Sequence, residues 1–273
     1  HIIGMIRLYM LVVQTRPQVI HLQWLTIPLV DICFIWLMQR IAPVVLTVHD
    51  VHPFNGVGAR LMHIGTRVAR AQCRGLIVHN EYSQQQLMEQ GIASDVIEVI
   101  PHGLLKPNES HATRSSSNKV RVVQVGTVQT YKGVDVLIDA VAKLPEEVRT
   151  SCEIAILGHP NMDIDPLVQQ IDRHGLSSCI RTQFQYLSDD ELATELDQAD
   201  IMVFPYTTIS TSGMLTTAIA RGMPVVASDI GCFNEMLTDG KNALLVPPSD
   251  SDAFASAIQR LMGDPDLRYT VGK

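Results

Sequence analysis

The chain has 273 residues, enough for about two domains of 100–150 residues each. Its hydrophobic content of 46% is normal for a globular protein, and its charged content of 18% lies below the usual value of about 25%, which suits strands buried on both faces. A net charge of −7 without a Lys/Arg block argues against nucleic-acid binding. Five scattered cysteines without a C-x-x-C pair argue against a disulfide framework or a structural zinc site and fit a reducing compartment.

The N-terminal half alternates between strand and helix patterns. Strands are predicted at Val19–Trp24, Val44–His49, Leu76–His79 and Val96–Ile100, and helices at Met5–Val13, Pro28–Arg40, Ala59–Ala71 and Tyr82–Gln90. The helix at Ala59–Ala71 is expected to carry Leu61, Ile64 and Val68 on its apolar face and Arg60, Arg67 and Arg70 elsewhere. Regular β-α-β-α order predicts a parallel sheet with helices on both faces.

The stretch Val19–Met38 is apolar enough to suggest a transmembrane helix. His21, Gln23 and Asp31 interrupt it, and Pro28 fits a break between a strand and a helix better, so we do not interpret it as a span. We expect a cytoplasmic protein, and peripheral contact with the inner face of the membrane stays open. The chain begins with a residue other than Met and shows no signal-peptide pattern.

Residues 106–118, KPNESHATRSSSN, are polar and are interpreted as a linker between domains at residues 1–105 and 119–273. The second half repeats the alternation. Strands are predicted at Val120–Val125, Glu153–Leu157, Ile180–Tyr186, Ile201–Phe204, Val225–Ser228 and Ala243–Val246. Helices are predicted at Val134–Leu144, Pro166–Arg173, Asp189–Gln198, Gly213–Arg221 and Asp252–Met262, the last capped by Asp250 or Ser251.

The polar loop Pro205–Ser212 separates an apolar strand from a short helix that begins near Gly213. The unpaired N–H groups of a helix start and the helix dipole together favour an anion, and a glycine lets a phosphate approach the backbone closely. Ser212 could equally be an ordinary N-cap, because serine is common there for local reasons. Lys132, six residues after Gly126 in a strand-to-helix turn, is either a phosphate-binding cation or a solvated loop lysine.

Four segments resemble the retaining family-4 glycosyltransferases. Ala218–Ala227, with the turns Gly231–Glu235 and Asp239–Ala243 after it, is similar to the donor-binding signature of that family. Val125–Gly133 resembles the turn that opens its C-terminal domain, Val99–Gly103 the strand that closes its N-terminal domain, and Val44–Asp50 the strand with its active-site histidine.

The resemblance implies the GT-B fold, an α/β architecture of two Rossmann-like, doubly wound parallel-sheet domains facing across a cleft. Compared with the family, the chain looks like an internal fragment, with the N-terminal domain incomplete and the C-terminal end missing. It also implies a glycosyltransferase that moves a sugar from a nucleotide-diphosphate sugar to an unknown glycan, lipid or small-molecule acceptor with retention, in polysaccharide biosynthesis or a related pathway. No metal and no cofactor are expected.

By the same resemblance, the donor diphosphate is expected on Gly126, Lys132, Ser212 and Gly213, and the transferred sugar is expected to face His49. The alternative for His49 is a structural histidine whose hydrogen bonds are satisfied within the protein. Glu235 either touches the donor or caps the next helix.

The chain departs from the family in two places. Thr127, Val128 and Gln129 stand where the family usually has an arginine, and Ile209 and Thr217 stand where it often has two glutamates. These losses motivate an alternative, a degenerate non-catalytic binding module; a nucleotide-sugar epimerase on the same scaffold is another.

Several acidic and histidine motifs suggest metal sites that we reject. His49, Asp50 and His52 form H-D-x-H, but no further ligand cluster is evident. The pairs Asp163/Asp165 and Asp189/Asp190 lie at expected helix starts, where Asp is a common cap.

Overall fold

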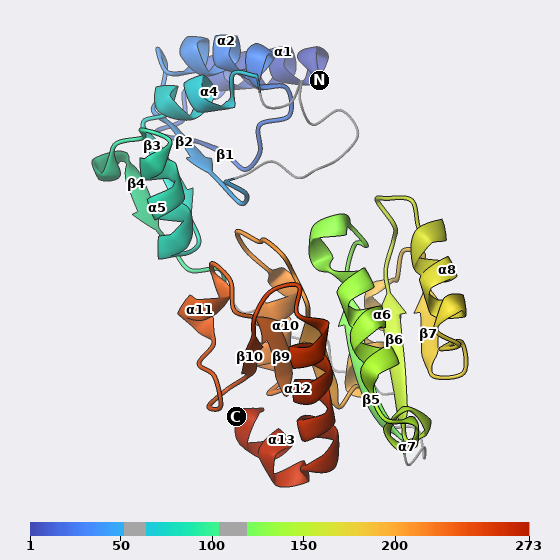
Figure 1. The fold of residues 1–273 in the computed structure, drawn as a ribbon. Helices are drawn as coiled ribbons and strands as arrows, with labels where there is room; N and C mark the ends of the chain where they lie inside the picture. Colours follow the sequence, from blue (N-terminus) through green and yellow to red (C-terminus); the bar gives the residue numbers. More distant parts are fainter. Residues whose placement is uncertain (52–63, 104–118, 273) are drawn as a thin grey trace. The chain divides into compact units, whose positions relative to one another are not determined.

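The computed structural model describes residues 1–51, 64–103 and 119–272 of the chain. The chain divides into two compact units, His1–His102 and Gly103–Lys273 (Figure 1). Each unit is built on one parallel sheet, as the alternation of strands and helices predicts.

The N-terminal unit has a four-stranded sheet in the order β1-β2-β3-β4. Its strands are β1 (Ile20–Leu22), β2 (Val44–Thr47), β3 (Gly75–Val78) and β4 (Ile97–Val99). Its helices are α1 (Ile2–Thr15), α2 (Pro28–Met38), α4 (Thr66–Gln72) and α5 (Glu81–Glu89), with a 3-10 turn at Ser94–Val96. Helix α2 packs between α1 and α4, and α5 packs on β3 and β4 (Figure 1).

Helix α4 corrects one prediction. Ile64 and Val68, expected on the apolar face, are each 53% exposed, whereas Ala69 and Arg70 are buried. Arg70 faces inward because its guanidinium donates to the carbonyls of Asp50 (2.8 Å) and Val51 (3.0 Å). The predicted apolar face is shifted by one residue from the buried face. An arginine in the sequence predicts an exposed position, whereas Arg70 is buried because backbone carbonyls accept its hydrogen bonds.

The C-terminal unit has a six-stranded parallel sheet in the order β10-β9-β8-β5-β6-β7. Its strands are β5 (Val120–Val125), β6 (Cys152–Leu157), β7 (Ile180–Gln183), β8 (Ile201–Phe204), β9 (Val225–Ser228) and β10 (Leu244–Val246). The longer helices are α6 (Val134–Lys143), α8 (Asp165–Arg173), α9 (Asp189–Asp197), α10 (Gly213–Ala220) and α12 (Ser251–Gly263). Three shorter helices are α7 (Glu146–Thr150), α11 (Phe233–Met236) and α13 (Pro265–Val271).

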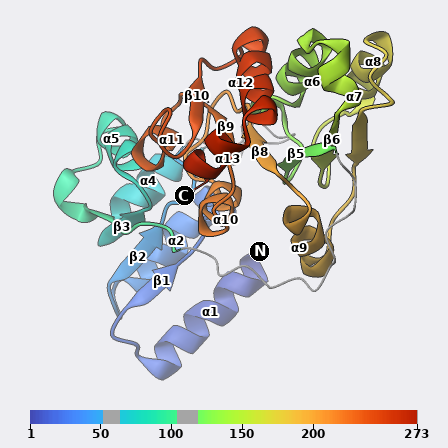
Figure 2. The same ribbon diagram turned by 90° about the horizontal axis from the view of Figure 1, so that it is seen from below.

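Helices cover both faces of this sheet. Helix α6 lies between α8 and α12 on one face, and α9 and α10 lie on the other (Figure 2). Strands β5, β8 and β9 agree with the predicted bounds, and Asp250 caps α12 by accepting from the Ala253 N–H at 2.9 Å. Strand β7 ends at Gln183, three residues earlier than predicted, and the short helices α7, α11 and α13 were not predicted.

The stretch considered as a membrane span is divided between β1 and α2. Within the described ranges, no helix has the length and apolar character that crossing a bilayer requires. The predicted linker, residues 106–118, lies outside the described residues, as does the start of the predicted Ala59–Ala71 helix.

Candidate functional site

Three turns of the C-terminal unit meet at the carboxyl ends of its central strands. The Gly126 N–H, just after β5, donates to the carbonyl of Leu157 at the end of β6 (3.0 Å). A Cβ on Gly158 would lie 2.1 Å from the Gly126 oxygen, and one on Gly133 would lie 1.9 Å from the Pro205 oxygen. Both glycines also have positive φ angles, 139° and 60°. The floor of the site is therefore main chain packed against main chain, at the sheet edge where open α/β proteins bind ligands.

Lys132 ends a 3-10 turn (Thr130–Lys132) that lies directly over this floor. The buried side chain of Gln124, on β5, holds the turn by donating to the Lys132 carbonyl at 2.8 Å. A Cβ built on Gly126 would lie 2.9 Å from the Lys132 Nζ and 3.8 Å from the Met214 Cγ. The ammonium, the glycine turn and the first turn of α10 thus lie beside one another.

The surroundings of the Lys132 ammonium disfavour its positive charge. Burial lowers its pKa to about 8. No carboxylate lies within 4 Å of Nζ in the part of the chain that the structure describes. A half-buried cation without an anionic partner among the described residues favours an anion from outside.

The first turn of α10 offers further donors. The Ser212 Oγ accepts from the Leu215 N–H at 3.2 Å, so the N-cap interpretation of Ser212 is confirmed. Among the described residues, the N–H groups of Gly213 and Met214 have no acceptor. A Cβ on Gly213 would meet nothing within 4 Å, so the space beside its Cα is open. The helix end thus keeps two N–H groups that can donate to an anion, although Ser212 is already used as the cap.

Aromatic rings form one wall of the site. The Tyr206 ring is 1% exposed and its centroid lies 5.2 Å from the Lys132 Nζ. It packs against the rings of Phe204 (5.7 Å) and Phe233 (5.6 Å). Burial raises the pKa of Tyr206. These rings keep water from one side of the ammonium, which explains its low pKa and strengthens its attraction for an anion.

Glu235 lies in the first turn of α11, and its side chain is exposed. The preceding Phe233 packs on Tyr206 and so brings this helix to the wall of the site. Both interpretations of Glu235, donor contact and helix start, fit this position.

The positions where the family pattern is lost are occupied by structural residues. Ile209 is buried, and the Thr217 hydroxyl donates to the Gly213 carbonyl at 2.9 Å within α10. Val128 is buried, and its N–H and C=O pair with His159 and Asn161. No carboxylate or arginine of this chain replaces the family side chains at these positions.

His49 belongs to the N-terminal unit, two residues after the end of β2. Its half-buried ring stacks on Trp24, with centroids 4.5 Å apart, and its Nδ1 lies 3.2 Å from the Nε2 of His79. Burial lowers the pKa of His49, and the charges of His79, His102 and His21 lower it further. The imidazole is therefore neutral near pH 7. Sequence reasoning missed Trp24 and His79, although each parallel strand of this unit has a histidine in it or just after it.

The metal interpretations find no support in the described ranges. No group of three or more His, Cys, Asp or Glu side chains is arranged there to hold an ion, and His52 lies outside the described residues. Asp163 accepts from the Asp165 N–H at 3.0 Å where α8 begins, and Asp189 and Asp190 lie in the first turn of α9.

Comparison with known proteins assigns the family. The model described as "Glycosyltransferase Family 4" matches residues 1–104, and the model described as "Glycosyl transferases group 1" matches residues 119–264, more than half of the chain. The chain belongs to the group 1 glycosyltransferases.

Curated relatives of the family support this assignment. The chain is 29% identical over 205 residues to the MMP alpha-(1->4)-mannosyltransferase of Mycolicibacterium hassiacum, covering 73% of this chain and 47% of the relative. It is 27% identical over 223 residues to the D-inositol 3-phosphate glycosyltransferase of Nocardia farcinica, covering 77% and 49%. The chain thus spans about half the length of these relatives.

Solved structures show the same fold. HepE from Anabaena, solved in complex with UDP and glucose, aligns with a TM-score of 0.80 at 21% identity, over 98% of this chain and 74% of that one. Sucrose-phosphate synthase from Thermosynechococcus elongatus aligns with a TM-score of 0.76 at 19% identity, over 94% and 67%. The predicted GT-B class, with one parallel α/β sheet in each unit, is confirmed.

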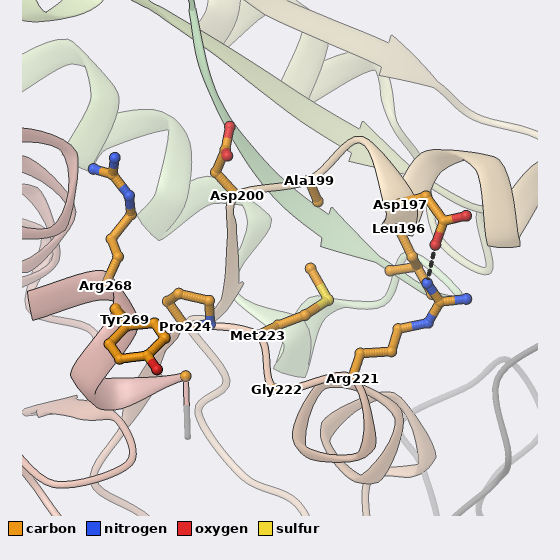
Figure 3. Close-up of a pocket in the computed structure, with 11 residues that line it drawn as sticks. Leu196, Asp197, Ala199, Asp200, Arg221, Gly222, Met223, Pro224, Arg268 and Tyr269 are labelled. Atoms are coloured by element: carbon orange, nitrogen blue, oxygen red, sulfur yellow. Dashed lines mark hydrogen bonds and ion pairs between the residues drawn. The ribbon is translucent and has the colours of Figure 1, made fainter. Parts of the chain in front are cut away.

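One part of the glycosyltransferase signature lies away from the proposed donor site. Arg221 and Gly222 end α10, and a Cβ on Gly222 would lie 2.7 Å from the Gly272 oxygen just after α13. Figure 3 shows the cavity beside this contact, where Arg221 pairs with Asp197. The cavity lies at the amino ends of β8 and β9, whereas Gly126 and Ser212 lie at the carboxyl ends of strands. The signature glycine therefore serves helix packing, apart from any role in binding.

Proposed function

We propose that this chain transfers a glycosyl group from a nucleotide-diphosphate sugar to an acceptor, with retention of configuration at the anomeric carbon. The observation that carries the proposal is the half-buried Lys132 ammonium beside Gly126 and the first turn of α10, whose Gly213 and Met214 N–H groups have no acceptor among the described residues. Membership of the glycosyltransferase family supports the reaction class. Retention and a glycan, lipid or small-molecule acceptor are parts of the proposal that rest on family resemblance. A cytoplasmic location and peripheral contact of the protein with the inner face of the membrane are parts that rest on the sequence.

The donor diphosphate would lie between Lys132 and the N–H groups of Gly213 and Met214. Cleavage of the glycosidic bond leaves negative charge on the departing nucleoside diphosphate, and a fixed cation with preorganised N–H donors stabilises that charge. These donors need no reorganisation, because the main-chain floor and the Gln124 hydrogen bond fix the Lys132 turn. In this proposal the reaction uses neither a metal nor a cofactor.

His49 is the proposed catalytic residue of the N-terminal unit. A neutral imidazole beside Trp24 can accept a hydrogen bond from a hydroxyl group of the transferred sugar. In the front-face mechanism that the family resemblance suggests, the leaving phosphate itself deprotonates the acceptor, so His49 positions and polarises the sugar. Because Ile209 and Thr217 cannot act as carboxylates, contacts to the sugar and ribose must come from other groups.

The test is calorimetric titration of UDP, GDP and ADP, with matching sugar conjugates, into the complete protein and two glycine variants. Gly213→Leu places a side chain into the open space beside the first turn of α10, and Gly263→Leu is the matched control because a Cβ there also meets nothing within 4 Å. We expect one nucleotide to bind saturably, Gly213→Leu to abolish that binding, and Gly263→Leu to leave it unchanged.

The outcomes separate the candidate functions. Binding that survives Gly213→Leu would move the diphosphate away from α10. Saturable binding together with isomerisation of the donor in the absence of any acceptor would favour the epimerase. A folded protein that binds none of the nucleotides would favour a degenerate binding module, the alternative suggested by the losses at Thr127, Ile209 and Thr217.

A further inference from the structure

The sheet of the N-terminal unit carries one histidine for each strand. His21 lies in β1, and His49, His79 and His102 follow β2, β3 and β4. The ring centroids of His49 and His79 are 5.0 Å apart, and those of His79 and His102 are 5.2 Å apart. Because all the strands are parallel, the three histidines after β2–β4 gather at the carboxyl edge of the sheet.

Hydrogen bonds determine which ring nitrogen carries the hydrogen in two of these histidines. The Nδ1 of His79 lies 3.0 Å from the carbonyl oxygen of Ile100. A carbonyl only accepts, so Nδ1 of His79 carries the hydrogen, and in the neutral ring Nε2 carries the lone pair. That Nε2 lies 3.2 Å from the Nδ1 of His49. The Nδ1 of His49 must then donate, which leaves the lone pair of His49 on Nε2.

The far side of the His49 ring faces the side-chain amide of Gln23. In the structure the amide oxygen, Oε1, lies 3.1 Å from the His49 Nε2, and the amide nitrogen lies 3.3 Å from the Nε2 of His21. The Nδ1–H tautomer of His49 requires the opposite orientation of this amide, in which the NH₂ group donates to the His49 lone pair and the oxygen faces His21. The Thr47 hydroxyl, 2.8 Å from the Nε2 of His21, closes the network. Trp24 holds the plane of the His49 ring by stacking on it.

We propose that His79 is a positioning residue that holds His49 in the Nδ1–H tautomer and so presents the lone pair of its Nε2 to the reaction. This inference rests on the proposed role of His49 in glycosyl transfer. The Ile100 carbonyl can only accept, and the backbone after β4 fixes its orientation, so it sets the tautomer of His79. The tautomer of His79 in turn sets the tautomer of His49.

The arrangement also implies sensitivity to acid. If both rings were doubly protonated, two N–H groups would face each other across 3.2 Å and the bond between His49 and His79 would be lost. The other described groups that act on His49 are His21 and His102, which add positive charge when protonated. The neighbouring Asp50 carboxyl adds negative charge when ionised, and the Arg70 guanidinium, bonded to the Asp50 carbonyl, adds a permanent positive charge.

Two substitutions at the same position separate positioning from structural support. His79→Gln places an amide oxygen near the former Nε2, where it can accept from His49, but it gives up the bond to Ile100. His79→Asn places an amide nitrogen near the former Nδ1, where it can donate to Ile100, but it is too short to reach His49. If His79 had a purely structural role, the Asn variant would have the higher kcat. If His79 positions His49, the Gln variant has the higher kcat.

The experiment combines nitrogen NMR of the full chain, labelled with ¹⁵N-histidine, with steady-state kinetics on the nucleotide sugar that binds. We expect His49 to be the Nδ1–H tautomer in the wild type and in His79→Gln, and a mixture of tautomers in His79→Asn. We also expect kcat to fall by about 10-fold or more in His79→Asn and by less in His79→Gln, with the nucleotide Kd unchanged in both.

Either of two results would overturn the inference. One is an Nε2–H tautomer at His49 in the wild type, and the other is a kcat for His79→Asn equal to or above that for His79→Gln. If the wild type turns over no nucleotide sugar, the proposed function fails, and the nitrogen spectra still decide whether His79 sets the tautomer of His49.

Discussion

Replacing Lys132 by methionine should stabilise the ligand-free protein while removing its affinity for nucleotide. Burial lowers the Lys132 pKa from 10.5 to about 8, so at pH 7 the folded state carries a charge that it disfavours. At 1.36 kcal/mol per pH unit, this disfavoured charge costs the folded state about 3 kcal/mol as an upper bound. Methionine keeps the unbranched stem against Tyr206 without the charge, so we expect a gain of about 1–3 kcal/mol in the free energy of unfolding.

The direction of the pKa shift determines how the stability gain of Lys132→Met changes with pH. The folded-state pKa of Lys132 lies below the unfolded value, so its contribution to stability is fully present above about pH 10.5 and is lost as pH falls through about 8. The advantage of Lys132→Met should therefore be full at pH 7 and vanish near pH 10.5.

The assay is urea unfolding followed by circular dichroism at pH 7 and at pH 10 to 10.5, beside titration of the nucleotide that binds. Lys143→Met is the control, because Lys143 is 40% exposed and pairs with an exposed carboxylate, that of Asp252. Its effect should stay within about 0.5 kcal/mol. Nucleotide binding should weaken by about 1–3 kcal/mol in Lys132→Met only. The reasoning would be refuted if Lys132→Met destabilised the protein at pH 7, or stabilised it equally at both pH values.

Three further predictions follow from single residues. Gly133→Ala should lower the free energy of unfolding by more than about 1 kcal/mol in denaturant titration, because its Cβ would lie 1.9 Å from the Pro205 oxygen at a φ of 60°; Gly175→Ala, with a similar φ but open space, should be milder. Burial raises the pKa of Asp50 to about 7, so its contribution to stability is full below about pH 3.8 and is lost as pH rises to about 7. Between these pH values, Asp50→Asn should remove a slope of up to about 1 kcal/mol per pH unit from the free energy of unfolding, and identical slopes in the two proteins would contradict this. His49→Ala should reduce turnover by about 100-fold or more with the nucleotide Kd unchanged, and unaltered turnover would exclude His49 as a catalytic residue.

The fold was predictable because several strands are short apolar runs and strands alternate with helices along the chain. Strands β5, β8 and β9 match the predicted residues, and the run Ile201–Phe204 is buried throughout, as is typical of a central strand. The short helices α7, α11 and α13 were missed because four to seven residues give too little periodicity. Arg70 was misplaced because its acceptors are backbone carbonyls, which leave no mark in the sequence.

The candidate site was predictable only in part, for a related reason. The Gly126–Gly133 turn and the Ser212–Gly213 helix start can be found from glycine, lysine and serine at strand ends. The contact that joins them, Lys132 beside Gly126 and Met214, depends on how three strands lie next to one another in the sheet. His79 was missed for the same reason: its partner Ile100 is 21 residues away in the sequence and becomes a neighbour only through the pairing of β3 with β4.

The stacking of Trp24 on His49 supplies an optical reporter of the candidate catalytic histidine. The chain contains two tryptophans, and the other, Trp36, lies under the guanidinium of Arg40 rather than beside a histidine. An imidazolium ring in contact with indole quenches its emission, whereas neutral imidazole does so far less. The fluorescence of a Trp36→Phe variant should therefore follow the protonation of His49 directly, in solution and without any label, and a bound sugar that displaces the Gln23 amide should change the same signal.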